Sequence, residues 1–327
     1  MKAIIPAAGI GSRLRPQTHT VPKALLHVAG KPIIGHILDH LVELDVSEVV
    51  IVVGDLGKKI EDYVQQNYQL KAVFVEQRDR LGLGHSIYLA LQATEPEPAI
   101  IVYGDTIFEG DIARGIDFSV DGALGVKEVS DPRRFGVVET KGGQIVKLVE
   151  KPEKPKSNLV IVGVNFINNF QLLLSCLKKV VEGNIKTRGE YQLTDAFQLM
   201  LEEGARLITF PIENWFDCGK PETLLATNRH LLEKFQYQGR PEGSVVKPPS
   251  YISANAQVEN SIIGPHVSVA DGAIIKNSII EDSIIGERAR VIDCMLKSSL
   301  VGEDAVLQGR YTQLNVGDSS EIKISPV

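Results

Sequence analysis

Five-residue segments of nearly the same sequence recur near the C-terminus and restrict how that part of the chain can fold. They read NSIIG at 260–264, NSIIE at 277–281, DSIIG at 282–286 and SSLVG at 298–302. The first, second and fourth are about 17 and 21 residues apart, close to one turn of a three-sided coil made of hexapeptide steps. Paired aliphatic residues at each step can stack into a central column. The pattern predicts a parallel β-helix, and a small β-sandwich is the alternative.

The first 110 residues alternate between strand-like and helix-like segments. Apolar runs predict strands at 2–6, 49–53, 72–75 and 99–103, and helical periodicity predicts helices at 33–44, 58–66 and 85–93. This alternation predicts right-handed crossovers and a parallel, doubly wound sheet. Later segments predict an antiparallel or mixed region with strands at 123–126, 136–139, 145–150, 159–167 and 207–211 and helices at 170–181 and 193–203.

Composition excludes several classes of protein. With 43% hydrophobic residues and a formal net charge of −6, the 327-residue chain lacks the basic excess of a nucleic-acid or membrane surface. No apolar run approaches the length of a membrane span, which is about 20 residues. The three cysteines, Cys176, Cys218 and Cys294, show no metal or disulfide spacing. We therefore expect a cytoplasmic protein with two domains.

A glycine-rich turn follows the first strand and is a candidate anion site. Gly9 and Gly11 allow the backbone to approach a ligand, and successive N–H groups in such a turn form an anion-binding concavity. Arg13 and Lys23 add positive charge. No GK[ST] follows as in a Walker loop, and Leu14 stands where a dinucleotide-binding loop needs a small residue. The turn is predicted to hold a polyphosphate.

Two aspartates follow apolar strand signals and are candidate metal ligands. Asp105 lies in YGDT after the strand at 99–103, at the sheet edge where ligands bind in open parallel sheets. Asp217 lies in WFDCGKPE and is either a second ligand or the N-cap of a helix that begins near Pro221. Mg²⁺ prefers one or two carboxylates with phosphate oxygens and water, so we expect Mg²⁺ here.

The segments FGVVE and LVEKP carry a candidate sugar-phosphate site. Glu150 can accept hydrogen bonds from sugar hydroxyls, and Lys151 can pair with a phosphate. Such a pair is also common on ordinary protein surfaces, so it gains meaning only from the other motifs.

Together these pieces resemble the sugar-1-phosphate nucleotidylyltransferase family. The resemblance covers about residues 1–235 and rests on PAAGIGSRLRP…VPKALL, VEQRDRLGLGHS, YGDT, FGVVE, VEKP, RGEYQLTDA and WFDCGKPE. It implies a Rossmann-like α/β domain with a mixed, mainly parallel sheet, and the repeats match the left-handed β-helix that several members carry. We expect a catalytic domain at 1–237, a linker at 238–250 and the β-helix at 251–327.

The resemblance also implies roles for individual residues. Ala8, Gly9, Gly11 and Arg13 would hold the nucleotide phosphates, with Lys23 beside the α-phosphate and Gln77 and Gly82 at the base. Asp105 and Asp217 would bind Mg²⁺. The sugar pocket would contain Gly136, Glu150 and Gly163, and Lys151 would grip the sugar phosphate.

The implied reaction transfers a nucleotidyl group from a nucleoside triphosphate to a sugar 1-phosphate and releases pyrophosphate. The resemblance favours dTTP or UTP as the nucleotide and glucose 1-phosphate as the sugar. The alternatives are a mannose-1-phosphate guanylyltransferase, an N-acetylglucosamine-1-phosphate uridylyltransferase and a catalytically silent regulatory subunit. We expect a homo-oligomer assembled through the β-helix. Acyl transfer by the β-helix is disfavoured because hexapeptide acyltransferases generally have a longer coil and a catalytic histidine, and His266 is the single histidine in these repeats. His85 is a further candidate near the base site.

Overall fold

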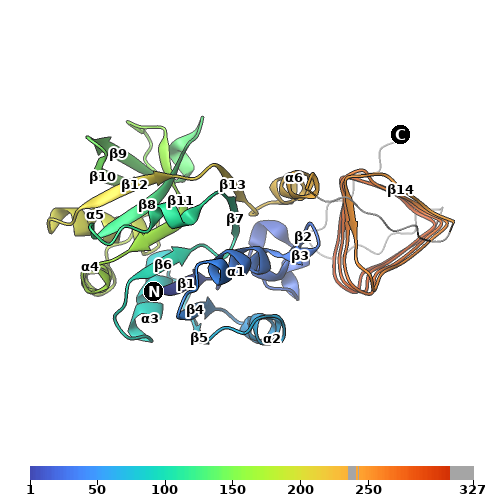
Figure 1. Cartoon of the computed structure of the whole chain (residues 1–327), viewed down its shortest axis with the longest axis horizontal. Helices are drawn as coiled ribbons and strands as arrows, with labels where there is room; N and C mark the ends of the chain where they lie inside the picture. Colours follow the sequence, from blue (N-terminus) through green and yellow to red (C-terminus); the bar gives the residue numbers. More distant parts are fainter. Residues whose placement is uncertain (235–240, 242, 310–327) are drawn as a thin grey trace. The chain divides into compact units, whose positions relative to one another are not determined.

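A computed structural model describes residues 1–234, 241 and 243–309 (Figure 1). Internal contacts divide the chain into two compact units. The sheet unit comprises Met1–Gly9 and Ile37–Phe216, and the coil unit comprises Ile10–His36 and Asp217–Val327. The predicted boundaries at 237 and 250 remain a prediction, and residues 238–240 and 242 of the predicted linker lie outside the described residues.

A nine-stranded mixed sheet forms the framework of the sheet unit. Its order is β5-β4-β1-β6-β11-β8-β12-β10-β9. These strands are β1 (Lys2–Pro6), β4 (Glu48–Val53), β5 (Ala72–Glu76), β6 (Ala99–Val102), β8 (Gly122–Glu128), β9 (Gly136–Lys141), β10 (Gln144–Glu150), β11 (Leu159–Ile167) and β12 (Leu207–Pro211). Two further strands, β7 (Thr106–Glu109) and β13 (Asn214–Asp217), form a separate two-stranded sheet that the sequence did not predict.

The parallel half of the sheet forms because its strands are apolar on both faces. Every residue of β4 is buried, and β1 lies parallel between β4 and β6 with Ile4 opposite Val50 and Ile101. Beyond β6 the direction changes, since β11 is antiparallel to both β6 and β8. The predicted strands and helices are confirmed to within a few residues at their ends.

Helices cover the sheet and bury its apolar residues. Those with residues in the sheet unit are α1 (Ile33–Glu43), α2 (Gly57–Asn67), α3 (Leu83–Gln92), α4 (Phe170–Glu182) and α5 (Leu193–Glu202). α3, α4 and α5 pack against one another and share one core with the sheet, in which Phe197 and Cys176 are fully buried. This packing fixes the carboxyl ends of β1, β4 and β6, where the candidate site residues follow.

The coil unit contains a triangular left-handed β-helix, drawn in orange to red in Figure 1. Its three parallel sheets have the orders β14-β17-β20-β23, β15-β18-β21-β24 and β16-β19-β22-β25. The strands are β14 (Val245–Val246), β15 (Ser250–Ile252), β16 (Gln257–Glu259), β17 (Ile262–Ile263), β18 (Val267–Val269), β19 (Ile274–Lys276), β20 (Ile279–Glu281), β21 (Ile284–Ile285), β22 (Arg290–Ile292), β23 (Met295–Lys297), β24 (Leu300–Val301) and β25 (Val306–Gln308).

The register of the coil corrects the predicted spacing of the repeats. Ile263 pairs with Ile280, so NSIIG and NSIIE are one turn apart as predicted. Ile285 pairs with Val301, which places SSLVG one turn after DSIIG and not one turn after NSIIE. The prediction that the 21 residues between NSIIE and SSLVG make up one turn of the coil was therefore wrong. Inward residues such as Ile280 are fully buried, whereas the neighbouring Ile279 points outward and is 43% exposed.

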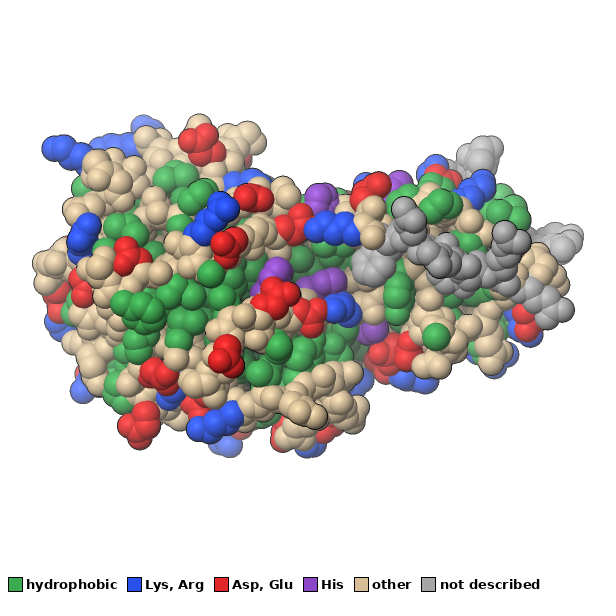
Figure 2. All heavy atoms as spheres, viewed as in Figure 1, with side chains coloured by type: hydrophobic (Ala, Val, Ile, Leu, Met, Phe, Trp, Pro, Cys, Tyr) green, Lys and Arg blue, Asp and Glu red, His purple; other side chains and the backbone are tan. Residues whose placement is uncertain are grey.

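The remaining elements of the coil unit precede the β-helix. A short hairpin joins β2 (His27–Val28) to β3 (Lys31–Pro32), and α6 (Pro221–Leu232) begins close to where the sequence predicted a helix. The hairpin was not predicted, because two-residue strands give no periodic signal. No helix among the described residues is long and apolar enough to cross a membrane. Figure 2 shows acidic and basic side chains interspersed over the face in view.

Candidate functional site

The turn after β1 lies open at the carboxyl end of its strand. Close backbone packing holds its start: a Cβ added at Gly54 would lie 3.1 Å from the Ala8 carbonyl oxygen, and one at Gly104 would lie 2.8 Å from that of Pro6. A Cβ added at Gly9 would meet no atom within 4 Å. The backbone at Ala8 and Gly9 is therefore fixed on one side and accessible to a ligand on the other.

The continuation of this turn in the coil unit carries positive charge. Gly11 has a φ of +65°, and a Cβ there would lie 3.0 Å from Thr18 Cγ2 and 3.2 Å from Lys23 Cβ. The Thr18 hydroxyl donates a 2.9 Å hydrogen bond to the Gly11 carbonyl oxygen. Lys23 is 7% exposed, whereas Arg13 is exposed. Gly11 is therefore required both by its backbone conformation and by its close contact with Lys23.

Asp217 and Arg13 converge on one glycine of the coil unit. A Cβ added at Gly219 would lie 2.7 Å from Asp217 Oδ1 and 3.0 Å from Arg13 Nη2. The N-cap of α6 is Lys220, whose backbone N–H donates a 3.2 Å hydrogen bond to Thr223 Oγ1. The N-cap interpretation of Asp217 is therefore wrong, and its carboxylate is placed beside a guanidinium instead.

Asp105 follows β6 in the sheet unit, as predicted. It is partly buried, and the Thr106 hydroxyl lies 3.4 Å from its Oδ1. The described residues contain no cluster of three or more His, Cys, Asp or Glu side chains that could enclose a metal ion. Single carboxylates such as Asp105 and Asp217 fit Mg²⁺, which takes its other ligands from phosphates and water.

The predicted base-site residues form a small polar cluster in the sheet unit. Gln77 is 6% exposed, and its amide nitrogen donates to the Gly82 carbonyl oxygen at 3.2 Å and to His85 Nδ1 at 3.1 Å. Burial lowers the pKa of His85, while the charge of Asp79 opposes that shift. Burial therefore favours the neutral imidazole, in which Nδ1 can accept the Gln77 amide hydrogen. Gly82 has a φ of +105°, and a Cβ there would lie 2.7 Å from the Tyr191 carbonyl oxygen.

The predicted sugar-site residues Gly136, Glu150 and Lys151 lie together. Gly136 and Glu150 are paired across β9 and β10, and a Cβ added at Gly136 would lie 3.2 Å from Glu150 Oε2. Lys151 Nζ lies 3.1 Å from Glu150 Oε1. The hydroxyl of Thr194, on α5, donates a 2.7 Å hydrogen bond to Glu150 Oε2. One carboxylate is thus fixed by a lysine on one oxygen and a hydroxyl on the other.

Tyr103 links the fourth predicted sugar-site residue, Gly163, to this cluster. Gly163 has a φ of +85°, and a Cβ there would lie 2.5 Å from the Tyr103 ring. Burial raises the pKa of the Tyr103 hydroxyl, and the charges of Glu150 and Asp105 raise it further. The tyrosine therefore remains neutral.

Two residues of this site were missed from the sequence. Tyr103 and Thr194 stand inside the motifs YGDT and RGEYQLTDA, but nothing in their spacing assigns them a role. The motif RGEYQLTDA can be recognised in the sequence. The role of Thr194 depends on its contact with Glu150, which lies 44 positions away and gives no local signal.

Comparison with known proteins identifies the family of the chain. The family model "Nucleotidyl transferase" matches residues 2–234. The chain is 31% identical over 306 residues to the glucose-1-phosphate thymidylyltransferase of Streptomyces antibioticus, covering 84% of each chain. It is 35% identical over 253 residues to the "Bifunctional protein GlmU" of Methanocaldococcus jannaschii, which covers 75% of this chain. That alignment spans 58% of the length of the GlmU protein.

A solved structure supports the fold. UDP-glucose pyrophosphorylase complexed with UDP-glucose is similar with a TM-score of 0.64 at 24% identity, covering 72% of this chain and 99% of that one. The family match covers most of the chain, including the nine-stranded sheet and the glycine turn after β1. The chain belongs to the nucleotidyl transferase family.

Proposed function

We propose that this protein is a sugar-1-phosphate nucleotidylyltransferase that forms a nucleotide sugar and releases pyrophosphate. The observation that carries the proposal is the cationic turn, in which Gly11 is packed in a left-handed conformation against the buried side chain of Lys23. Such a turn supports binding of a triphosphate, because backbone N–H groups and fixed cations are in place before the ligand arrives.

The reaction requires that two anions approach each other. A phosphate oxygen of the sugar 1-phosphate attacks the α-phosphorus of the nucleotide in line, a P–O bond forms, and the bond to the departing pyrophosphate breaks. No protein nucleophile or base is needed, because the attacking oxygen is already ionised. We assign Lys23 to the α-phosphate, Arg13 to the leaving pyrophosphate and Lys151 to the sugar phosphate, so that catalysis rests on positioning and charge neutralisation.

The sugar is proposed to bind beside Glu150. The Glu150 carboxylate is held by Thr194 and Lys151, so its oxygens are fixed in position to accept hydrogen bonds from sugar hydroxyls. Both neighbouring glycines are required by close packing. A side chain at Gly136 would collide with Thr194, and one at Gly163 would collide with Tyr103.

Asp105 and Asp217 are the proposed carboxylate ligands of Mg²⁺. When bound, the ion would neutralise phosphate charge and stabilise the charge that develops during transfer. Arg13, close to Asp217 at Gly219, supplies a second positive charge near that carboxylate.

For the substrates, we propose dTTP or UTP with glucose 1-phosphate. Guanylyl transfer to mannose 1-phosphate and uridylyl transfer to N-acetylglucosamine 1-phosphate are the alternatives. A silent regulatory subunit is disfavoured because Arg13, Lys23, Asp105 and Asp217 are all present. A homo-oligomer formed through the β-helix and a cytoplasmic location are further proposals.

A screen of pyrophosphate release tests the function. The purified chain is incubated with Mg²⁺ and each of five nucleoside triphosphates against glucose, mannose, galactose and N-acetylglucosamine 1-phosphates. We expect the fastest release with dTTP or UTP and glucose 1-phosphate. Fastest release with GTP and mannose 1-phosphate would select the guanylyltransferase alternative, and no release with any pair would contradict the enzymatic proposal.

A further inference from the structure

The segment that carries the cationic turn rests on one face of the β-helix. Before Lys23, the Gln17 amide nitrogen donates to the Leu300 carbonyl oxygen at 3.2 Å. After Lys23, the Gly30 N–H donates to Ser268 Oγ at 3.2 Å. Ser268 and Leu300 belong to the same sheet, β15-β18-β21-β24. Both flanks of the turn are therefore attached to the β-helix within the coil unit.

The second attachment is at the tip of the β2–β3 hairpin. Ala29 and Gly30 have φ values of +48° and +94°, so the tip is a tight left-handed turn. A Cβ added at Gly30 would lie 2.7 Å from the ring of Tyr251, in β15. The hairpin thus touches the β-helix through its backbone, and a larger residue at its tip would separate them.

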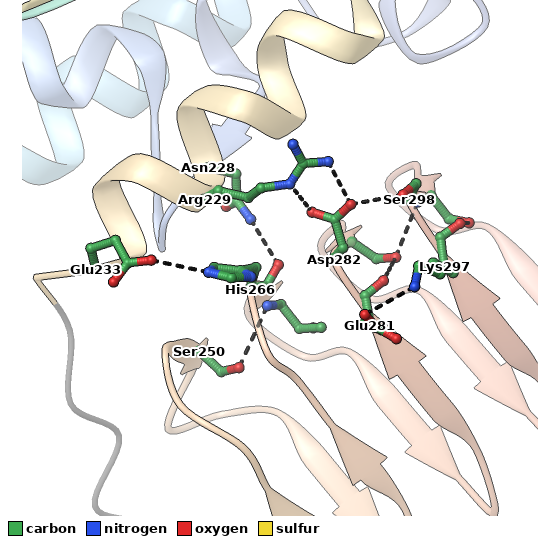
Figure 3. Close-up of polar contacts among 12 residues, drawn as sticks. Asn228, Arg229, Glu233, Ser250, His266, Glu281, Asp282, Lys297 and Ser298 are labelled. Carbon is green, nitrogen blue, oxygen red and sulfur yellow. Dashed lines mark hydrogen bonds and ion pairs between the residues drawn. The ribbon is translucent and has the colours of Figure 1, made fainter.

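Asn228, on α6, connects the hairpin to the β-helix. Its Oδ1 accepts a 2.9 Å hydrogen bond from the Ala29 N–H, and its Nδ2 donates a 3.2 Å hydrogen bond to the His266 carbonyl oxygen. Figure 3 shows the Asn228 amide directed at His266. The side chain is fully buried. A buried amide that uses both its acceptor and its donor is costly to replace, because each partner would be left without its hydrogen bond.

An ion pair from Arg229 in α6 and a contact of Glu233, the C-cap that follows α6, attach this helix to the β-helix (Figure 3). Arg229 makes a two-pronged contact with Asp282, with Nη2 2.6 Å from Oδ2, and the Ser298 hydroxyl donates to the same oxygen at 2.7 Å. His266 Nε2 lies 3.1 Å from Glu233 Oε1. Burial alone would raise the pKa of Asp282, but its bonds to Arg229 and Ser298 outweigh burial and lower that pKa. These contacts fix α6, and hence Asn228, on the β-helix.

A short chain of hydrogen bonds leads from the hairpin back to the turn. The Ile33 N–H donates to the Leu26 carbonyl oxygen at 3.1 Å and closes the base of the hairpin. The Leu26 N–H donates to the Lys23 carbonyl oxygen at 3.1 Å. A shift of the hairpin therefore moves Lys23, whose side chain is in close contact with Gly11.

We propose that Asn228 is a positioning residue for the nucleoside triphosphate. It joins the β2–β3 hairpin to the β-helix, and the β-helix thereby braces the turn that holds Gly11 and Lys23. The proposal rests on the proposed function. It assigns the β-helix a part in nucleotide binding by the same chain, separate from any part in assembly.

Asn228→Ala tests this proposal, with Asn277→Ala as the matched control. The exposed Asn277 bonds to Asp293 within the β-helix, so its loss also removes an asparagine hydrogen bond there. For Asn228→Ala we expect the KM for the nucleoside triphosphate to rise about tenfold, as loss of a buried hydrogen bond predicts. The KM for the sugar 1-phosphate should stay within about twofold, because Glu150 and Lys151 belong to the other unit. For Asn277→Ala both KM values should be unchanged.

A milder variant and a second measurement cover the case in which Asn228→Ala does not fold. Ser268→Ala removes the acceptor of the Gly30 N–H, and we expect the same selective rise in the nucleotide KM at a smaller size. Hydrogen exchange of residues 10–36, measured without substrate, should increase in Ser268→Ala and not in Asn277→Ala.

Equal rises of both KM values, or unchanged KM values together with a lower melting temperature, would overturn the positioning role. Unchanged exchange of residues 10–36 in Ser268→Ala would also overturn it. Absence of turnover in the unaltered chain would instead contradict the proposed function, while the exchange measurement would still test whether the β-helix braces the turn.

Discussion

The Thr194 hydroxyl donates a 2.7 Å hydrogen bond to Glu150 Oε2 and joins the start of α5 to the end of β10. Thr194 is 6% exposed, so water competes little for this contact. Burial raises the pKa of the adjacent Asp195, and Glu150 raises it further, while the Thr187 hydroxyl opposes the shift. Asp195 therefore lies in surroundings that disfavour its charge, and the Thr194 hydroxyl determines how the neighbouring Glu150 carboxylate is oriented.

Replacing Thr194 by valine should weaken sugar binding selectively. Valine keeps the shape of threonine but leaves Glu150 without the hydroxyl, and a hydrogen bond to a charged group contributes about 1.5–3 kcal/mol. We expect the KM for the sugar 1-phosphate to rise about tenfold, since 1.4 kcal/mol corresponds to a factor of about ten. Thr194→Ser keeps the hydroxyl and should stay close to the unaltered protein. An equal rise in the nucleotide KM would contradict the assignment of Glu150 to the sugar.

Asp105→Asn tests the proposed metal ligand. An amide keeps the size of the side chain but loses the charge, so pyrophosphate release should fall by at least about a hundredfold while the far-ultraviolet circular dichroism spectrum is unchanged. The control is Asp111→Asn, because Asp111 is an exposed N-cap that accepts from the Ala113 N–H at 3.0 Å. Unchanged turnover and an unchanged Mg²⁺ dependence in Asp105→Asn would refute the assignment.

The sequence was sufficient for the sheet and for most of the residues around Glu150. The continuous apolar run Val49–Val53 predicts a strand buried on both faces, and β4 has that environment. Hydrophobic periodicity and turn residues are signals that extend over a few neighbouring residues, so a short stretch of sequence is enough to detect them. The register error in the β-helix arose because two similar segments, 277–281 and 282–286, stand on adjacent faces of the same turn, which their sequences do not distinguish.

The association of Ile10–His36 with the β-helix could not be predicted from the sequence. It depends on Asn228, which meets Ala29 across 199 residues of chain, and on Gln17, which meets Leu300 across 283. Each contact is a single hydrogen bond, and one hydrogen bond leaves no periodic pattern in the sequence. Such contacts follow from the final packing of the coil unit, and a local rule does not specify them.

Glu48 gives a pH dependence of stability in the sheet unit. Its carboxylate is 2.6 Å from Lys71 Nζ and accepts a 2.7 Å hydrogen bond from Thr94, with Lys2 Nζ 3.3 Å away. These contacts lower the pKa of Glu48 from 4.5 to about 2 despite its burial, and the contact with Lys71 has the largest effect. A carboxyl whose pKa is lower in the folded state stabilises the protein above about pH 4.5. This contribution is lost as the pH falls from there towards 2.

Glu48→Gln should therefore reduce the free energy of unfolding at pH 7 by about 1–3 kcal/mol, a range discounted because Lys71 is exposed. The difference from the unaltered protein should shrink as the pH approaches 2.5. Urea unfolding at both pH values measures it, with Glu61→Gln on α2 as the control, because Glu61 is partly exposed and pairs with Lys58. A difference that stays constant with pH would show that Glu48 acts through packing and not through its charge.

Gly219→Ala probes the place where Arg13 and Asp217 converge. The added methyl would lie 2.7 Å from Asp217 Oδ1 and 3.0 Å from Arg13 Nη2, closer than unstrained contacts allow, so both side chains must move. If Asp217 binds Mg²⁺, the Mg²⁺ concentration for half-maximal activity should rise and kcat should fall, each on the order of tenfold. Gly302→Ala in the same unit is the control, because its methyl would meet only Gln17 Cγ, at 3.9 Å. A fall in kcat without any change in the Mg²⁺ requirement would assign the effect to Arg13 and remove Asp217 from the metal site.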